Sequence, residues 1–183
     1  MVRYEIIKPS DGHNNCTVVI KGERAELSEI RLEDCGLETN EILSMVEGFE
    51  IGSGVKIKIF DGSMYDDKEK RRSQMKSAGG HGIGSINILF NNMDNDASLI
   101  HFLVDEDERS EGFGSILFLI FIGLCKVEGA EKIRMNIGGG QDTIDWLAKM
   151  GVPKEDMKVE GHDLARVHTN LSEIDYNKQR LKV

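Results

Sequence analysis

An apolar run at residues 116–125, ILFLIFIGLC, constrains the fold of this chain more than any other feature. A helix through this run would be apolar on nearly every side, and such a helix is stable only when other elements cover it. The same run could form a buried strand, because hydrophobic periodicity alone does not separate the two. Its length is about half of what a membrane-spanning helix needs. We therefore predict a deeply buried element, with a helix over residues 114–127 that Gly129 ends.

Alternating and apolar segments on both sides of this run predict a sheet. Strands are predicted at residues 2–8, 16–21, 55–60, 83–90, 97–104, 132–137, 157–160 and 165–171. Helices are predicted at residues 25–35, 39–49, 114–127 and 141–150. The polar turn at residues 91–96 should pair its flanking strands antiparallel, and the glycine-rich stretch 61–84 should form a loop or a short solvated helix. This order predicts a mixed α/β fold, with residues 1–183 as a single domain.

Composition excludes several classes of function. The chain has 23 Lys and Arg against 32 Asp and Glu, which gives a net charge of −9 with histidine neutral. Coating duplex nucleic acid needs a basic surface, and one Trp with three Tyr makes no broad base-stacking platform. No nucleic-acid partner is therefore expected. An acidic surface slightly favours cationic partners such as amines.

Cysteine use and the N-terminal residues indicate a reduced compartment. The three cysteines, Cys16, Cys35 and Cys125, are far apart and show no CxxC spacing. Neither a disulfide framework nor a cysteine-rich zinc site is expected, and no metal is predicted. The first fifteen residues hold no apolar stretch of signal-peptide length. These features predict a cytoplasmic protein that does not cross a membrane; its oligomeric state stays open, with a homodimer among the options.

The segment RSEGFG at residues 109–114 joins an apolar strand to the apolar helix. A helix N-terminus presents unpaired N–H groups and the positive end of the helix dipole, and both favour phosphate oxygens. Gly112 and Gly114 would let the backbone approach a bulky anion, and Arg109 could add a guanidinium contact. A plain strand-to-helix turn with two convenient glycines is the alternative. The segment is not a Walker loop, since no Gly-Lys-Ser/Thr follows, and it fits a dinucleotide motif poorly.

In its context, VDEDERSEGFGSILFLIF, this segment resembles the acetyl-CoA-binding signature of the GCN5-related N-acetyltransferase (GNAT) superfamily. That family has Arg/Gln-x-x-Gly-x-Gly/Ala at a strand-to-helix junction, and an apolar residue five positions before the Arg or Gln. Arg109, Gly112, Gly114 and Val104 stand in those places. The resemblance extends over about residues 83–152; the N-terminal half is similar only in element order. It implies a GNAT-like fold, a central and mostly antiparallel sheet with a splayed parallel strand pair, flanked by helices.

The resemblance also implies an activity, direct transfer of an acetyl group from the cosubstrate acetyl-CoA to an amine acceptor, either a small molecule or a protein amine. The strand end formed by Phe102, Leu103 and Val104 would bind the pantetheine arm through its backbone and would splay from the strand at residues 132–137. The diphosphate would bind at the loop and first helical turn, which comprise Arg109, Ser110, Glu111, Gly112, Phe113, Gly114 and Ser115.

The sequence departs from the family's pattern where acid chemistry is expected. The family often has a tyrosine near the end of the last helix that protonates the leaving thiolate, and WLAKMGV places Leu147 there. Leucine has no proton to donate. The helix start often carries asparagine, and here it is Gly140. The neighbouring Trp146 is interpreted as a core anchor and not as an acid.

Three histidines are weak candidates for a general base. Some family members carry a base on the strand before the loop, on the face that would be shared by Ser98, Ile100 and Phe102. Alternation places His101 on the opposite face of an unbroken strand, although a bulge would change this; a structural histidine is the alternative. His162 and His168 lie near the predicted closing strands, and either could titrate near neutrality.

Two further clusters are interpreted as loops. Residues 105–108, Asp-Glu-Asp-Glu, and Glu111 oppose the charge of CoA phosphates, so backbone donors and Arg109 would have to dominate binding. A solvated loop explains these carboxylates better than a metal site does. The glycine cluster at residues 79–84 leads into a strand and lacks a helix dipole, which favours a flexible loop.

Three hypotheses follow from the sequence. The first is an acetyl-CoA-dependent N-acetyltransferase. The second is a catalytically impaired GNAT-like scaffold that binds CoA or a partner protein, which Leu147 and Gly140 favour. The third is a different strand-loop-helix fold whose glycines only turn the chain.

Overall fold

The structure is a computed structural model of the chain. It describes residues 3–7, 16–22, 54–61, 82–91, 94–106, 109 and 112–175. The helices predicted at residues 25–35 and 39–49 lie outside the described residues, and so does most of the predicted loop at 61–84.

The described strands and helices follow the predicted order. The strands are β1 (Arg3–Ile7), β2 (Cys16–Gly22), β3 (Val55–Asp61), β4 (Gly84–Asn91), β5 (Asp96–Val104), β6 (Lys132–Gly138), β7 (Met157–Glu160) and β8 (Leu164–Asn170). The helices are α5 (Phe113–Val127) and α6 (Gly140–Lys149), with short 3-10 turns η2 (Lys154–Asp156) and η3 (Leu171–Glu173). Each predicted element that falls on described residues is confirmed to within one residue at either end.

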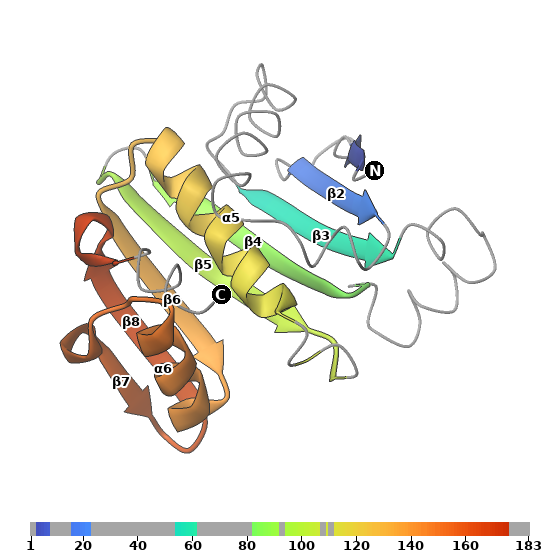
Figure 1. Cartoon of the computed structure of the whole chain (residues 1–183). Coiled ribbons are helices and arrows are strands. Elements are labelled where there is room, and N and C mark those ends of the chain that lie inside the picture. The colour runs from blue at the N-terminus through green and yellow to red at the C-terminus, as the bar shows by residue number, and fades with distance from the viewer. Residues whose placement is uncertain are drawn as a thin grey trace.

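The strands form one mixed sheet in the order β1-β2-β3-β4-β5-β6-β8-β7 (Figure 1). Two neighbouring pairs are parallel, β2 with β3 and β5 with β6, and the other pairs are antiparallel. The last strand, β8, inserts between β6 and β7. Within the described residues, this is the predicted mixed α/β fold, mostly antiparallel, with a parallel strand pair near its centre.

Helix α5 forms the centre of the core. Every side chain at residues 116–122 is buried, as its apolar sequence predicts. The helix lies across β4 and β5 (Figure 1) and packs on the residues of β4 that point toward it, Ile86, Ile88 and Phe90. Burial of each such side chain contributes about 1.5–3 kcal/mol. The apolar residues 116–122 can therefore form a helix, since the sheet offers a large apolar face that covers it.

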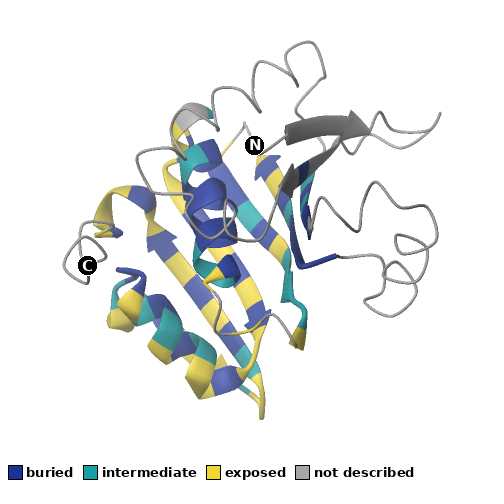
Figure 2. Ribbon diagram, turned by 45° about the vertical axis from the view of Figure 1, so that its right-hand side comes forward, coloured by how far each residue is buried: buried dark blue, intermediate teal, exposed yellow. Residues whose placement is uncertain are grey.

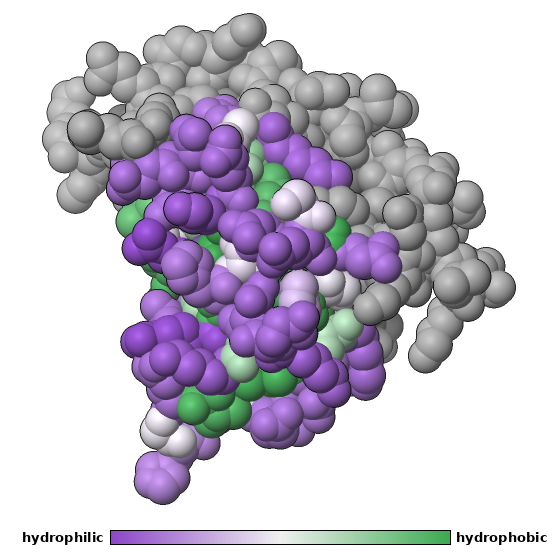
Figure 3. All heavy atoms as spheres, turned by 90° about the vertical axis from the view of Figure 1, so that its left-hand side faces the viewer, coloured by the Kyte–Doolittle hydropathy of each residue, from purple (hydrophilic) through white to green (hydrophobic). Residues whose placement is uncertain are grey.

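Helix α6 lies on the same side of the sheet as α5, over β6, β8 and β7 (Figure 1). Residues of β6 and β8 alternate between buried and exposed (Figure 2). Side chains such as Ile133 and Val167 point toward the helices and are buried, and their neighbours Arg134 and His168 point the other way and are exposed. Seen from the β7 edge, the described surface is mainly hydrophilic (Figure 3). Among the described residues, no helix is long and apolar enough to cross a membrane.

Candidate functional site

Strands β5 and β6 separate part-way along their length. Their parallel pairing runs from Asp96 and Lys132 to Leu99 and Met135 and ends there. Beyond this point β5 stays paired with β4 as far as Val104, and β6 stays paired with β8. We call residues 100–104 of β5 and 136–138 of β6 the splay. Backbone groups of β5 that turn toward β6 in the splay have no sheet partner there and can bind an inserted ligand.

A β-bulge in β5 marks the start of the splay. Asn87 of β4 is opposite His101, and the next residue, Ile88, is opposite Leu99, which leaves Ile100 as the extra residue. Ile100 is 53% exposed, although it lies within a central strand. A bulge shifts the alternation of side chains by one residue. Relative to the residues before Ile100, the residues after it therefore point to the faces opposite to those of an unbroken strand.

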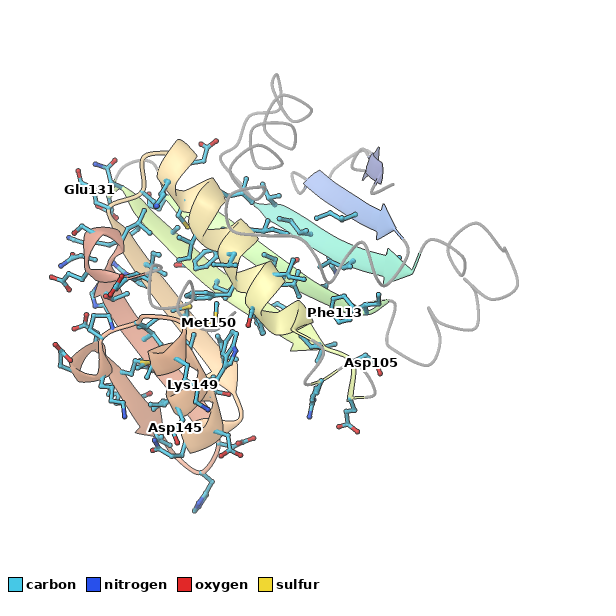
Figure 4. The ribbon with its side chains drawn as sticks, in the orientation of Figure 1. Asp105, Phe113, Glu131, Asp145, Lys149 and Met150 are labelled. Atoms are coloured by element: carbon cyan, nitrogen blue, oxygen red, sulfur yellow. The ribbon has the colours of Figure 1, made fainter. Side chains whose placement is uncertain are left out.

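The helix N-terminus lies beside the end of β5. Asp105, which follows β5, and Phe113, the first residue of α5, are near each other at one end of the sheet (Figure 4). Gly112 precedes the helix in a left-handed conformation, with φ of 88°, and its carbonyl accepts the first helical hydrogen bond from Ile116. Among the described residues, none accepts a hydrogen bond from the amides of Phe113, Gly114 or Ser115. Unpaired N–H groups at a helix N-terminus, together with the helix dipole, favour an anion.

The two glycines of the motif have different roles. A Cβ added at Gly112 would meet no heavy atom within 4 Å, so its side faces open space, and its positive φ is one that other residues rarely adopt. A Cβ at Gly114 would contact Trp146, Val104 and Phe102 at 3.7–3.8 Å, which are ordinary contact distances. Gly112 therefore shapes the turn and leaves an open approach, whereas the position of Gly114 has room for an alanine side chain.

Arg109 turns back onto the end of β5. Its Nε donates a hydrogen bond to the carbonyl of Val104 at 3.4 Å, and its guanidinium lies 3.9 Å from a carboxylate oxygen of Glu106. The side chain is 59% exposed, so the ion pair contributes little to stability. Arg109 is free to exchange Glu106 for another anion. Ser110 and Glu111, which sequence places in the same loop, lie outside the described residues.

An aromatic cluster closes the helix side of the splay. The ring of Trp146 on α6 lies 5.4 Å from that of Phe102 and 5.7 Å from that of Phe118, between centroids. Trp146 is half-buried, as expected of a core anchor. The next residue, Leu147, is fully buried, so the helix presents no proton donor at that position. Gly140 begins α6, where its amide donates to the carbonyl of Asp163.

His101 lies on the face of the sheet away from α5, and this corrects one prediction. The bulge turns Phe102 and Val104 toward α5, and it places His101 on the same far face as Ser98. The predicted face shared by Ser98, Ile100 and Phe102 does not exist, because it assumed an unbroken strand. His101 Nε2 is 3.2 Å from the hydroxyl oxygen of the fully buried Ser85.

The surroundings of His101 favour its neutral form. Partial burial, together with the charges of Lys56 and Lys58, lowers the pKa of the imidazole from its ordinary value. Burial and the charge of Lys56 also lower the pKa of the Lys58 ammonium. A neutral imidazole at physiological pH can accept a proton, which a general base requires.

The other two histidines lie farther from the splay or at its rim. His168 is exposed on β8 opposite Arg134, and Arg134 is in turn opposite Ser98, where β5 and β6 are still paired. His162 is exposed in the turn after β7, next to Asp163, whose carboxylate accepts a hydrogen bond from the Gly139 amide. Of the three histidines in the described residues, the geometry therefore brings only His101 next to the bulge.

The described residues contain no group of three or more histidine, cysteine, aspartate or glutamate side chains placed to hold a metal ion. Cys125 is a free, buried thiol, and burial raises its pKa, which keeps it protonated and unreactive. Two surface cavities of about 460 and 440 Å³ lie elsewhere, beside Glu131 and Leu171 and beside Val152 and Glu155. Glu131 is at the opposite end of α5 from Phe113 (Figure 4).

No protein-family model and no curated protein matches this chain. Solved structures do match it. The structural neighbours are acetyltransferases of the GCN5-related family. A putative acyl-CoA N-acyltransferase from Klebsiella pneumoniae aligns at 10% identity and a TM-score of 0.48, over 93% of this chain and 98% of that one. An acetyltransferase from Bacillus subtilis in complex with CoA aligns at 16% identity and a TM-score of 0.42, over 64% and 97%.

Tetrahymena GCN5 aligns at 17% identity and a TM-score of 0.37, over 53% of this chain and 64% of that one. The matched part spans only 58% to 64% of the first five neighbours. At such low sequence identities, the structural similarity indicates a similar fold and nothing more.

Proposed function

We propose that this protein is an acetyl-CoA-dependent N-acetyltransferase. The observation that carries the proposal is the position of the splay beside a helix N-terminus whose first amides, at Phe113, Gly114 and Ser115, have no acceptor among the described residues. A ligand with an extended arm and a diphosphate could engage both at once. The arm would lie along β5, and the diphosphate would lie against the first turn of α5.

The chain would bind acetyl-CoA mainly through its backbone. Phe102, Leu103 and Val104 would offer main-chain groups to the pantetheine arm on the side of β5 that β6 has left. Gly112 would leave room for the diphosphate, and Ser110, Glu111 and Ser115 would complete the loop around it. Arg109 would exchange its contact with the exposed Glu106 for a phosphate oxygen. These donors would have to outweigh the carboxylates of Asp105 and Glu106.

The reaction would be direct transfer. A neutral amine would attack the thioester carbonyl carbon, a C–N bond would form, and the C–S bond would break as the thiolate leaves. The amine would lose its proton to His101, whose neutral form is favoured by partial burial and by the neighbouring lysines. Because Leu147 has no proton to donate, the thiolate would take its proton from solvent. Most of the rate would then come from positioning and from polarisation of the carbonyl.

Calorimetry with acetyl-CoA tests the first step, and thioester cleavage across a panel of amines tests the second. We expect saturable binding followed by release of CoA only when an amine is present. No binding at millimolar acetyl-CoA would contradict the proposal.

The second candidate function is a scaffold that binds CoA or a partner protein without catalysis. The buried Leu147, in place of a proton donor, favours it. Binding without cleavage for every amine in the panel would support this alternative.

A further inference from the structure

Ile100 is the most exposed large apolar side chain in the described part of the chain. Its exposed fraction is 53%, against 38% for Leu89 and 38% for Val159, the other two exposed side chains of this kind. Ile100 belongs to β5, which lies inside the sheet between β4 and β6. Isoleucine is among the residues that are most often buried. Its exposure at this position therefore has a local cause.

The local cause is the β-bulge at the start of the splay. Ile100 is the extra residue of the bulge, and it directly follows Leu99, the last residue of β5 that pairs with β6. Bulges occur often beside active sites, where they redirect a side chain. Leu99 and its partner Met135 are both buried. Ile100 therefore lies at the closed end of the splay, as the first residue past the paired part of the two strands.

The open end of the splay lies beside the first turn of α5. A Cβ added at Gly114 in this turn would be 3.7 Å from a methyl carbon of Val104, the last residue of β5. From Val104 back to Ile100 the strand extends about 13 Å, at about 3.3 Å per residue. The splay thus offers a path of this length between the proposed diphosphate position and Ile100.

The arm of the coenzyme matches this path in length. About twelve bonds separate the diphosphate oxygen from the thioester sulfur, as many as the backbone bonds of about four extended residues, which span about 13–14 Å. An arm extended along β5 from the first turn of α5 therefore brings its sulfur to Ile100. The acyl group, which is attached to this sulfur, would lie against the exposed part of the Ile100 side chain.

The other side chains of the splay suit a hydrocarbon group. Residues 100–104 of β5 and 136–138 of β6 contain one ionisable side chain, His101. On the helix side, the rings of Phe102 and Trp146 are 5.4 Å apart, between centroids, and both are half-buried. Apolar groups gain free energy when they leave water for such surroundings. The exposed part of Ile100 adds apolar surface at the end of this path.

We propose that Ile100 contacts the acyl group of the coenzyme and that the protein prefers acyl chains of three or four carbons to acetyl. Each methylene that becomes fully buried improves affinity about fourfold. Ile100 would cover the chain from one side, so we expect about half of that free energy, which is about twofold per methylene. The inference rests on the proposed function and extends its donor class from acetyl-CoA to short-chain acyl-CoA esters.

Calorimetry with a series of acyl-CoA esters tests this inference without a known acceptor. The Kd of acetyl-CoA, propionyl-CoA and butyryl-CoA should fall about twofold at each step, and so about fourfold over the series. We expect 3-hydroxybutyryl-CoA, which adds one hydroxyl to the same four-carbon chain, to bind more weakly than butyryl-CoA. A hydroxyl loses its water when it is placed against an apolar side chain. CoA without an acyl group measures the affinity of the arm and the diphosphate alone.

Substitutions of Ile100 test its part in the preference. Ile100→Ser removes the apolar surface, so the fourfold gain from acetyl-CoA to butyryl-CoA should disappear, while the Kd of CoA stays within about twofold of the wild type. Val159→Ser is the matched control, because it removes an exposed aliphatic side chain from the edge strand β7; it should keep the full gain. Ile100→Thr retains the β-branched shape that strands favour, and it replaces Ile100→Ser if that variant does not fold. It should lose at least half of the gain.

The outcomes separate this inference from the proposed function. Equal Kd values for the three esters in the wild type would overturn this inference alone, and so would 3-hydroxybutyryl-CoA that binds as tightly as butyryl-CoA. A full gain in Ile100→Ser or Ile100→Thr would overturn it as well. If neither CoA nor any of its esters binds at millimolar concentration, the proposed function fails, and this inference fails with it.

Discussion

Replacing Gly112 with glutamate should weaken coenzyme binding by at least about 30-fold without unfolding the protein. The backbone of Gly112 has a φ of 88°, and its side faces open space at the start of α5. A left-handed conformation costs a residue with a side chain about 1–2 kcal/mol. For a chain of this size that lowers Tm by about 2–8 °C. The added carboxylate would occupy the approach that we assign to the diphosphate.

The expected loss of affinity follows from the charges. A carboxylate about 4 Å from a phosphate oxygen is repelled by about 1 kcal/mol in a water-like medium. A diphosphate presents two such charges, so the repulsion is about 2 kcal/mol, or about a 30-fold rise in Kd. Steric exclusion of the diphosphate would add to this. Calorimetry with acetyl-CoA measures the change directly.

Gly129 offers a matched control on the same helix. It follows the C-terminus of α5 with a φ of 72°, and an added Cβ there would also meet no heavy atom within 4 Å. Gly129→Glu should be at least as destabilised as Gly112→Glu, because a carboxylate is unfavourable at the C-terminal end of a helix dipole. It should nevertheless bind acetyl-CoA like the wild type. Equal affinity for Gly112→Glu and wild type, or equal loss in both variants, would refute the assignment.

Three further outcomes are expected. The value of kcat/KM should fall on the acid side of its pH profile, below pH 6.5, the ordinary pKa of histidine, because burial and two lysines lower the pKa of His101. His101→Gln should remove this fall, and a fall that persists in the variant would exclude His101 as the base. Trp146→Ala should lower the free energy of unfolding, measured by urea denaturation, by about 2–4 kcal/mol, because the Trp146 ring packs on Phe102. Trp146→Phe should recover most of this loss. Arg134→Met should lower the free energy of unfolding by about 1–3 kcal/mol, because it leaves the buried Asp96 carboxylate unpaired. A smaller loss of stability in Arg134→Met than in Asp96→Asn would contradict this.

The helices and strands in the described residues could be predicted because each carries its own local signal. The run at residues 116–122 is apolar on all sides, and the structure buries all of it. The alternation in β3 and the polar turn between β4 and β5 predict the strands and their antiparallel pairing, both confirmed. The ends of the helices were marked by glycines with positive φ, at Gly129 and Gly151.

The bulge at Ile100 could not be predicted from the strand that contains it. No glycine or proline marks the bulge in the strand DASLIHFLV, and the alternation of an unbroken strand places His101 on the face opposite Ser98, whereas the bulge puts both on one face. The bulge depends on pairing with β4 on one side and on the loss of pairing with β6 on the other, and both are long-range. The proximity of Lys56, Asn87 and His101 was missed for the same reason, because they are far apart in sequence and only strand register brings them together.

The central claim is that the first amides of α5 hold the diphosphate of a coenzyme. A titration of the ¹⁵N-labelled protein with CoA, followed by amide chemical shifts, tests it most directly. We predict large, saturable shifts at Phe113, Gly114 and Ser115 and none at Lys126 or Gly129, at the other end of the helix. Unchanged shifts at the first three amides at millimolar CoA, or shifts confined to the other end, would contradict the claim.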